Sequence, residues 1–179
     1  MRKSLIAEIF KVLKAQFCKE VADVKITKAL ESHLDGILAI EEVSFSDPWT
    51  MDSLHYEINR FESVCLVAVG EACGDVLGFV TMRFVLDEGH ILNIAVEPSA
   101  RKKGIGKRLL LALFCESGKR GVASFVLEVR SKNSAAIALY EKLGFEAQGL
   151  RRNYYTKPSD DGIVMRKQQR PLIVCNFIT

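Results

Sequence analysis

The chain has 179 residues, of which 49% are hydrophobic and 26% are charged. This length suits one domain with a packed core, and this composition excludes long intrinsic disorder. The net charge of +3 does not by itself indicate a nucleic-acid partner, so we expect no binding to DNA. No apolar run approaches the roughly 18 residues of a membrane span, so we expect no membrane-spanning segment.

The cysteines are odd in number and irregularly spaced, and the sequence has no C-x-x-C pair. This pattern fits neither a disulfide framework nor a metal site. We therefore expect no bound metal and reduced thiols that fill apolar space. Reduced thiols are typical of cytosolic proteins, which favours a cytoplasmic location. The cysteines are Cys18, Cys65, Cys73, Cys115 and Cys175.

Residues 1–20 form a candidate extension outside the main domain. Leu5, Ile9 and Leu13 recur at helical spacing among lysines, which predicts an amphipathic helix that packs on the domain or on a partner. Glu8 interrupts the apolar stretch and no small-residue cleavage site follows, which disfavours a signal peptide. An organellar presequence, a helix on a membrane surface and a disordered tail from an early start codon stay open as alternatives.

From residue 23 onward the hydrophobic period predicts elements in chain order. Alternating apolar and charged residues predict a strand, and apolar residues three and four apart then predict two helices, the second capped by Thr50. Runs rich in Val, Ile and Phe next predict three strands joined by short turns. The expected ranges are 23–28 for the first strand, 31–45 and 51–60 for the helices, 63–69, 76–86 and 90–96 for the three strands, and 73–75 and 87–89 for the turns.

Helices and strands alternate in the second half of the chain. A helix with Leu109, Leu110 and Leu113 on one face comes first, and Gly121 ends it. Hairpins before it and β-α crossovers after it predict a mixed α/β (α+β) sheet of about seven strands with helices on both faces. The expected ranges are 104–120, 124–129, 133–143, 145–149 and 162–165, within one domain at residues 21–166 that an apolar tail at residues 167–179 follows.

The segment Arg101-Lys102-Lys103-Gly104-Ile105-Gly106 lies between a predicted strand and a predicted helix. The first amide N–H groups of a helix have no partner within it and carry partial positive charge. The glycines let a ligand approach the backbone, and Lys107 adds positive charge, so the segment suits a pyrophosphate. Arg108 replaces the Ser or Thr of a nucleotide P-loop, and Leu109 replaces the third glycine of a dinucleotide fingerprint. Taken alone, the segment leaves an ordinary Gly turn open as an alternative.

The most specific motifs of the chain are R-x-x-G-x-G after a strand and the run LEVRSKNSAAIALYEKLGF at residues 127–145. The first resembles the acetyl-CoA motif of the GNAT superfamily of N-acetyltransferases. The second, with residues 45–49 and 151–155, resembles the RimI family of ribosomal-protein-alanine N-acetyltransferases. The resemblance covers about residues 22–166. It implies the GNAT fold of an acyl-CoA N-acyltransferase, with central parallel strands that splay apart, and direct attack of an amine on the thioester of acetyl-CoA in a ternary complex.

The resemblance implies a catalytic base and a catalytic acid. A protein α-amino group has a pKa of about 7.7–8.0, so it is mostly protonated at neutral pH and must lose a proton before attack. Glu128 is the expected base, acting directly or through water, and alternation places Leu127 and Val129 on the opposite face of the sheet. The family's tyrosine that matches Tyr140 protonates the leaving thiolate. His90 is a second candidate base, while a salt-bridged Glu128 and a core Tyr140 are the structural alternatives.

Binding residues for the two substrates follow from the same resemblance. One predicted strand offers backbone groups to the pantetheine arm of CoA, the Gly-rich turn holds the pyrophosphate, and an asparagine caps the next helix and bonds CoA. Aromatic side chains are expected to line the acceptor groove, with core packing as the alternative. The expected cofactor-binding residues are Ile94, Ala95, Val96, Arg101, Lys102, Lys103, Gly104, Ile105, Gly106, Lys107 and Asn133, and the expected acceptor residues are Trp49, Tyr154 and Tyr155.

The resemblance implies transfer of acetyl from acetyl-CoA to a protein N-terminal α-amine, without a metal. The implied acceptor is the N-terminal alanine of small-subunit ribosomal protein eighteen. Arg151 and Arg152 beside two tyrosines are weak evidence for transient contact with ribosomal RNA. Acetylation of another protein N-terminus or of a small amine stays open. A non-catalytic module that binds CoA or the ribosome also stays open, although the presence of both Glu128 and Tyr140 argues against it.

Overall fold

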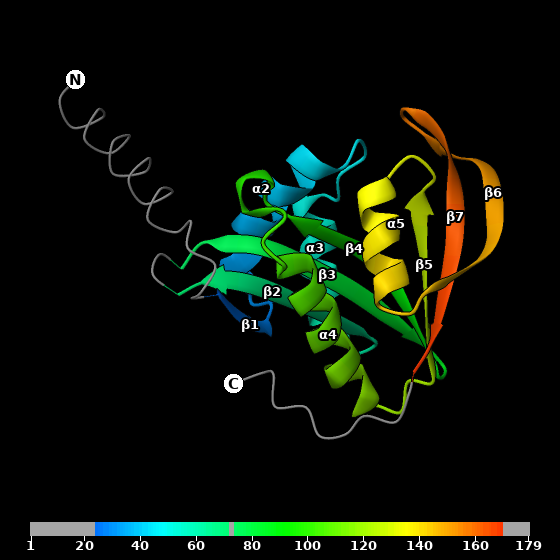
Figure 1. Ribbon diagram of the computed structural model, residues 1–179. Coiled ribbons are helices and arrows are strands. Elements are labelled where there is room, and N and C mark those ends of the chain that lie inside the picture. The colour runs from blue at the N-terminus through cyan, green and yellow to red at the C-terminus, as the bar shows by residue number, and fades with distance from the viewer. Residues whose placement is uncertain (1–23, 72–73, 170–179) are drawn as a thin grey trace.

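The computed structural model of the chain describes residues 24–71 and 74–169. Within them seven strands form one sheet in the order β1-β2-β3-β4-β5-β7-β6 (Figure 1). The predicted mixed sheet is confirmed. The strands are β1 (Val24–Lys28), β2 (Ser63–Gly70), β3 (Val76–Val85), β4 (Glu88–Val96), β5 (Ser124–Arg130), β6 (Glu146–Thr156) and β7 (Ser159–Gln168). The helices are α2 (Leu34–Ser44), α3 (Met51–Asn59), α4 (Ile105–Gly118) and α5 (Ser134–Lys142), with short 3₁₀ turns η2 (Glu31–His33) and η3 (Pro98–Ala100).

The two terminal segments of the predicted domain organisation remain predictions. The helix expected in residues 1–20 lies outside the described residues, as do residues 170–179 of the tail expected at 167–179. Within the described part of the chain, no helix combines the length and the apolar character needed to cross a membrane.

Helices cover both faces of the sheet, as predicted. Strand β2 shows why, because its side chains alternate between two cores. Val64 and Leu66 pack in the larger core with α4 and α5, whereas Cys65 and Val67 pack in the smaller core with α2 and α3. Since both faces of this strand are buried, the sheet needs a helical layer on each side.

The pairing of the parallel strands β4 and β5 stops halfway. It runs from Glu88 opposite Ser124 to Ile91 opposite Leu127, although β4 continues to Val96 and β5 continues to Arg130. Beyond Ile91 the two strands diverge, which confirms the expected splay. Beyond Ile91, β4 remains hydrogen-bonded to β3 along its other edge.

A β-bulge marks the point of divergence. On β3, Met82 pairs with Ile91 and Thr81 pairs with Asn93, so Leu92 between them is the extra residue of β4. A bulge bends its strand and strengthens the local twist. The bend therefore begins at the residue where β4 leaves β5.

One turn and the last hairpin differ from the prediction. The turn expected at residues 87–89 consists of Leu86 and Asp87, because Val85 already pairs with Glu88. The last hairpin is longer than the predicted strands at 145–149 and 162–165. Nearly every side chain of β6 is exposed, so this strand shows no apolar alternation that would reveal its length.

Candidate active site

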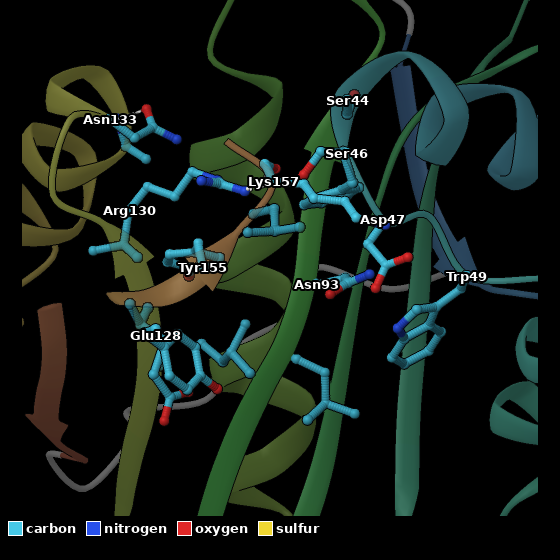
Figure 2. Close-up of a pocket in the computed structure, with 18 of the residues that line it drawn as sticks. Ser44, Ser46, Asp47, Trp49, Asn93, Glu128, Arg130, Asn133, Tyr155 and Lys157 are labelled. Carbon is cyan, nitrogen blue, oxygen red and sulfur yellow. Dashed lines mark hydrogen bonds between the residues drawn. The ribbon is translucent and has the colours of Figure 1, made fainter. Parts of the chain in front are cut away.

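A cleft of about 680 Å³ opens where β4 and β5 part (Figure 2). Its walls come from β4, β5, α5, the loop between α2 and α3, and the hairpin of β6 and β7. The cleft brings together both expected catalytic residues, all three expected acceptor residues and two of the expected cofactor-binding residues. These lining residues are Glu128, Tyr140, Trp49, Tyr154, Tyr155, Ile94 and Asn133.

Glu128 is the first residue of β5 beyond the last pair with β4. Its neighbours Leu127 and Val129 are buried in the larger core, which agrees with the predicted alternation. The Glu128 side chain is 26% exposed, and its Oε1 lies 3.3 Å from Nη1 of Arg151. Glu128 therefore lines the cleft and is also salt-bridged, and its role as a base remains a prediction.

Tyr140 reaches the cleft from α5, on the opposite face of the sheet. Its ring is buried and lies 5.7 Å from the ring of Phe145, centroid to centroid. Burial raises the pKa of Tyr140, and the neighbouring Tyr155 raises it further. The phenol is therefore protonated at neutral pH, and it can donate that proton. Tyr140 is a core residue and a cleft residue at once.

His90, the second candidate base, lies outside the cleft lining. Its Nε2 is 2.7 Å from Oε1 of Glu88, on the part of β4 that is still paired with β5. The position of His90 does not favour a role as base. Within residues 24–71 and 74–169, no group of three His, Cys, Asp or Glu side chains is arranged to hold a metal ion.

The two helices that the sequence analysis linked to CoA, α4 and α5, begin as predicted. Gly104 caps α4 at a φ of 82°, and the first helical bond runs from the Arg108 N–H to the Gly104 carbonyl over 3.0 Å. The amides between them have no partner within the helix and carry partial positive charge. Asn133 caps α5, because its side-chain oxygen accepts the Ala136 N–H at 3.1 Å. This geometry suits a phosphate at α4.

Arg101 has a bracing contact that the sequence did not predict. Its Nε donates to the Val96 carbonyl at 2.9 Å, and its Nη2 donates to Ser44 Oγ at 3.3 Å. The side chain thus ties the end of β4 to the end of α2. The segment at residues 101–107, together with Ala95 and Val96, lies beyond the cleft lining, and its role in binding CoA remains a prediction.

Gly104→Ala should destabilise the chain by about 1–2 kcal/mol, because a residue with a Cβ is strained at positive φ. A Cβ at Gly104 would meet no heavy atom within 4 Å, so the cost lies in the backbone alone. Urea unfolding measures it. Gly106→Ala is the matched control, since its Cβ would make ordinary contacts at 3.4 Å to Leu139 and 3.7 Å to Val96. That variant should be as stable as the parent or more so, and an equal loss in both would contradict the argument.

The sequence analysis did not single out Glu41 and Asn93, two polar residues that are hydrogen-bonded to each other. Asn93 lines the cleft next to the bulge, and its Nδ2 donates to Oε1 of the buried Glu41 at 2.6 Å. The other carboxylate oxygen of Glu41 accepts the Trp49 N–H at 3.2 Å. Burial raises the pKa of Glu41, while these two hydrogen bonds oppose that rise. The sequence does carry a signal for Glu41, because helical spacing places this carboxylate on the buried face of α2 with Leu34 and Ile37. Arg130, a third missed residue, also lines the cleft.

The comparisons with known proteins agree with this geometry. Residues 34–145 match the model of the acetyltransferase (GNAT) family. The chain is 49% identical over 94 residues to the ribosomal protein bS18-alanine N-acetyltransferase of Escherichia coli, a match that spans 51% of this chain and 64% of that relative. It is 36% identical over 135 residues to the Haemophilus influenzae protein of the same name, covering 73% of this chain and 89% of that relative. The chain belongs to the GNAT acetyltransferase family and, within it, to the RimI family that its motifs resemble.

Solved structures show the same fold. The crystal structure of the ribosomal-protein-S18-alanine N-acetyltransferase from Escherichia coli has a TM-score of 0.75 and 34% identity, and the match covers 87% of this chain and 99% of that one. A PaiA N-acetyltransferase from Thermoplasma acidophilum, solved in complex with coenzyme A, has a TM-score of 0.69 at 21% identity, covering 82% of this chain and 99% of that one. The second likeness concerns the fold alone.

Proposed function

We propose that the chain transfers the acetyl group of acetyl-CoA to a protein N-terminal α-amine, with the N-terminal alanine of ribosomal protein S18 as acceptor. One observation carries the proposal. Glu128 and Tyr140 come from opposite faces of the sheet and line one cleft at the point where β4 and β5 part. A carboxylate and a protonated phenol in one cleft are the groups that proton removal and proton return require. The similarity to ribosomal protein bS18-alanine N-acetyltransferases supports this acceptor.

Acetyl-CoA fits the donor side. Beyond Ile91, the edge of β4 that faces the cleft is not paired with β5, so it offers backbone groups to the amides of a narrow chain such as pantetheine. The N-terminus of α4 suits the pyrophosphate. A fold neighbour was solved with coenzyme A and another, a plant NAA60, with acetyl-CoA. Acetyl-CoA is a substrate that is consumed in each turnover.

The chemistry needs two proton movements from this chain's own residues. Glu128 accepts a proton from the acceptor ammonium, directly or through water, and the free amine attacks the thioester carbonyl carbon. A C–N bond forms and the C–S bond breaks, while Tyr140 gives its proton to the departing sulfur. The nitrogen loses its second proton as the amide forms, so each turnover releases an N-acetylated chain, CoA and one net proton.

Intact-mass analysis of a peptide panel tests the function. The full chain is incubated with acetyl-CoA and with peptides of the S18 N-terminal sequence that begin with Ala, that begin with other residues, or whose α-amine is blocked. Small amines complete the panel. We expect the mass of one acetyl group on Ala-starting peptides with a free α-amine. No shift on any Ala-starting peptide would overturn the proposal, and a shift on small amines alone would replace it.

A further inference from the structure

Arg130, the last residue of β5, extends across the cleft between two separate walls. Its Nη1 donates to the Pro158 carbonyl at 2.9 Å, and its Nη2 donates to the Lys157 carbonyl at 2.8 Å and to Ser46 Oγ at 3.0 Å. Its guanidinium carbon lies 4.2 Å from the ring centroid of Tyr155. Figure 2 shows the side chain reaching from β5 toward Ser46 and Lys157.

The contacts of Arg130 lie on both walls of the expected acceptor groove. Ser46 belongs to the loop between α2 and α3, which also carries Trp49. Lys157 and Pro158 form the turn between β6 and β7, close to Tyr155. An acceptor that lies between these aromatic side chains has one wall on each side, and Arg130 bonds to both.

Arg130 also stands beside the expected base. It is two residues after Glu128 on the same strand, so the two side chains lie on one face of the sheet. The guanidinium therefore spans the groove on the face of β5 that also carries Glu128, the proposed base. A planar guanidinium with five N–H donors can hold three acceptors on two elements and stack on a ring, which an ammonium cannot do.

We propose that Arg130 is a positioning residue that sets the separation of the two acceptor walls and restricts the first acceptor residue to a small side chain. The inference rests on the proposed function. A small first side chain, as in alanine, fits beside the guanidinium. A larger one displaces the guanidinium from its carbonyl partners, which leaves a cation and carbonyl groups without their hydrogen bonds.

The first test compares acceptor selectivity in the parent, Arg130→Lys and Arg130→Gln. Two peptides that differ only in an Ala or Leu first residue are assayed at saturating acetyl-CoA. We expect the Ala-to-Leu ratio of kcat/KM to fall by about tenfold in both variants, within the range that pocket size confers on enzymes. The change should appear mainly as a lower KM for the Leu peptide, because the variants no longer lose the Arg130 hydrogen bonds when a large side chain enters, with the KM for acetyl-CoA unchanged. Lysine should not rescue, whereas a merely structural role of the positive charge predicts that it does.

The variant Ser46→Ala tests the contact of Arg130 with one wall alone. This variant removes one contact and leaves Arg130 bonded to the hairpin, so we expect a smaller fall in the same ratio. Its effect should not add to that of Arg130→Gln in the double variant, because both changes break the same contact.

Arg120→Lys is the matched control. Arg120 has the same chemistry as Arg130, with Nη1 donating to the Phe61 carbonyl at 3.0 Å and the guanidinium 4.8 Å from the Phe84 ring centroid. It lies outside the cleft lining. The control should leave the Ala-to-Leu ratio unchanged.

The second test needs no activity, because Trp49 is the single tryptophan of the chain and lies in one of the two walls. We expect acrylamide to quench Trp49 fluorescence more strongly in Arg130→Gln than in the parent and in Arg120→Lys. Unchanged quenching and an unchanged Ala-to-Leu ratio in a folded, active variant would overturn the role of Arg130. If the parent acetylates no peptide, the proposed function and the acceptor restriction both fail, and increased quenching would then show only that Arg130 holds the walls.

Discussion

Replacing Glu128 by glutamine should lower kcat at neutral pH by about 10²-fold or more, the usual contribution of a general base. Glutamine keeps the shape of the side chain and removes the group that accepts the proton. The fold should tolerate the change, because the ion pair with Arg151 is partly exposed and such pairs contribute only about 0–1 kcal/mol. Steady-state kinetics with an Ala-starting peptide measures the effect.

The pH dependence separates a base from a structural residue. The acceptor α-amine has a pKa of about 7.7–8.0, so above that range most of it is already deprotonated without help. The ratio of parent to Glu128→Gln activity should therefore shrink as the pH rises past 8, whereas a misfolded site predicts a constant ratio. Glu146→Gln, on an exposed position of β6, is the matched control and should match the parent at every pH. A Glu128 variant with parental kcat at neutral pH would sink the role of base.

Replacing Tyr140 by phenylalanine should also lower kcat by about 10²-fold or more, because the departing thiolate loses its proton donor. Phenylalanine preserves the tilted ring contact with Phe145 at 5.7 Å, so stability and the KM for acetyl-CoA should change little. Since burial raises the pKa of Tyr140, the parent hydroxyl stays protonated throughout the assay range. We therefore expect no alkaline fall in parental kcat from this group below a pH of about 10.

Tyr56→Phe is the control for that change, because Tyr56 is 62% exposed on α3 and lies outside the cleft lining. It removes a phenol hydroxyl, which accepts from Arg60 at 3.2 Å, without touching the cleft. The control should keep parental kcat. Equal kcat in Tyr140→Phe and Tyr56→Phe would rule out Tyr140 as the acid.

Most of the fold could be predicted from sequence because most elements bury a face. The cap at Thr50 is confirmed, since its Oγ1 accepts the Ser53 N–H at 3.2 Å. Strand β6 shows the limit of this reasoning. Its side chains are exposed almost throughout, and its pairing with β7 is irregular between Arg151 and Tyr155. Apolar periodicity reports burial, so it carries no signal where neither face is buried.

The candidate site was predictable only in part. Alternation along β5 places Glu128 on the face opposite Leu127, and the resemblance identified it. The contacts that shape the cleft depend on long-range packing. Arg130 bonds Ser46 across 84 residues of sequence, and Asn93 bonds Glu41 across 52. No local spacing encodes such pairs, because they exist only after the sheet has assembled.

The early end of the pairing between β4 and β5 gives this sheet an open edge in its interior. Exposed strand edges are templates for pairing with other chains, and they are a common route to aggregation. Here the edge beyond Ile91 lies within a cleft whose walls Arg130 joins. The loop between α2 and α3 and the hairpin of β6 and β7 form walls of that cleft, so a strand of another chain would have to pass between them to pair with the edge. The same walls that enclose the proposed site should therefore protect the protein from edge-to-edge association.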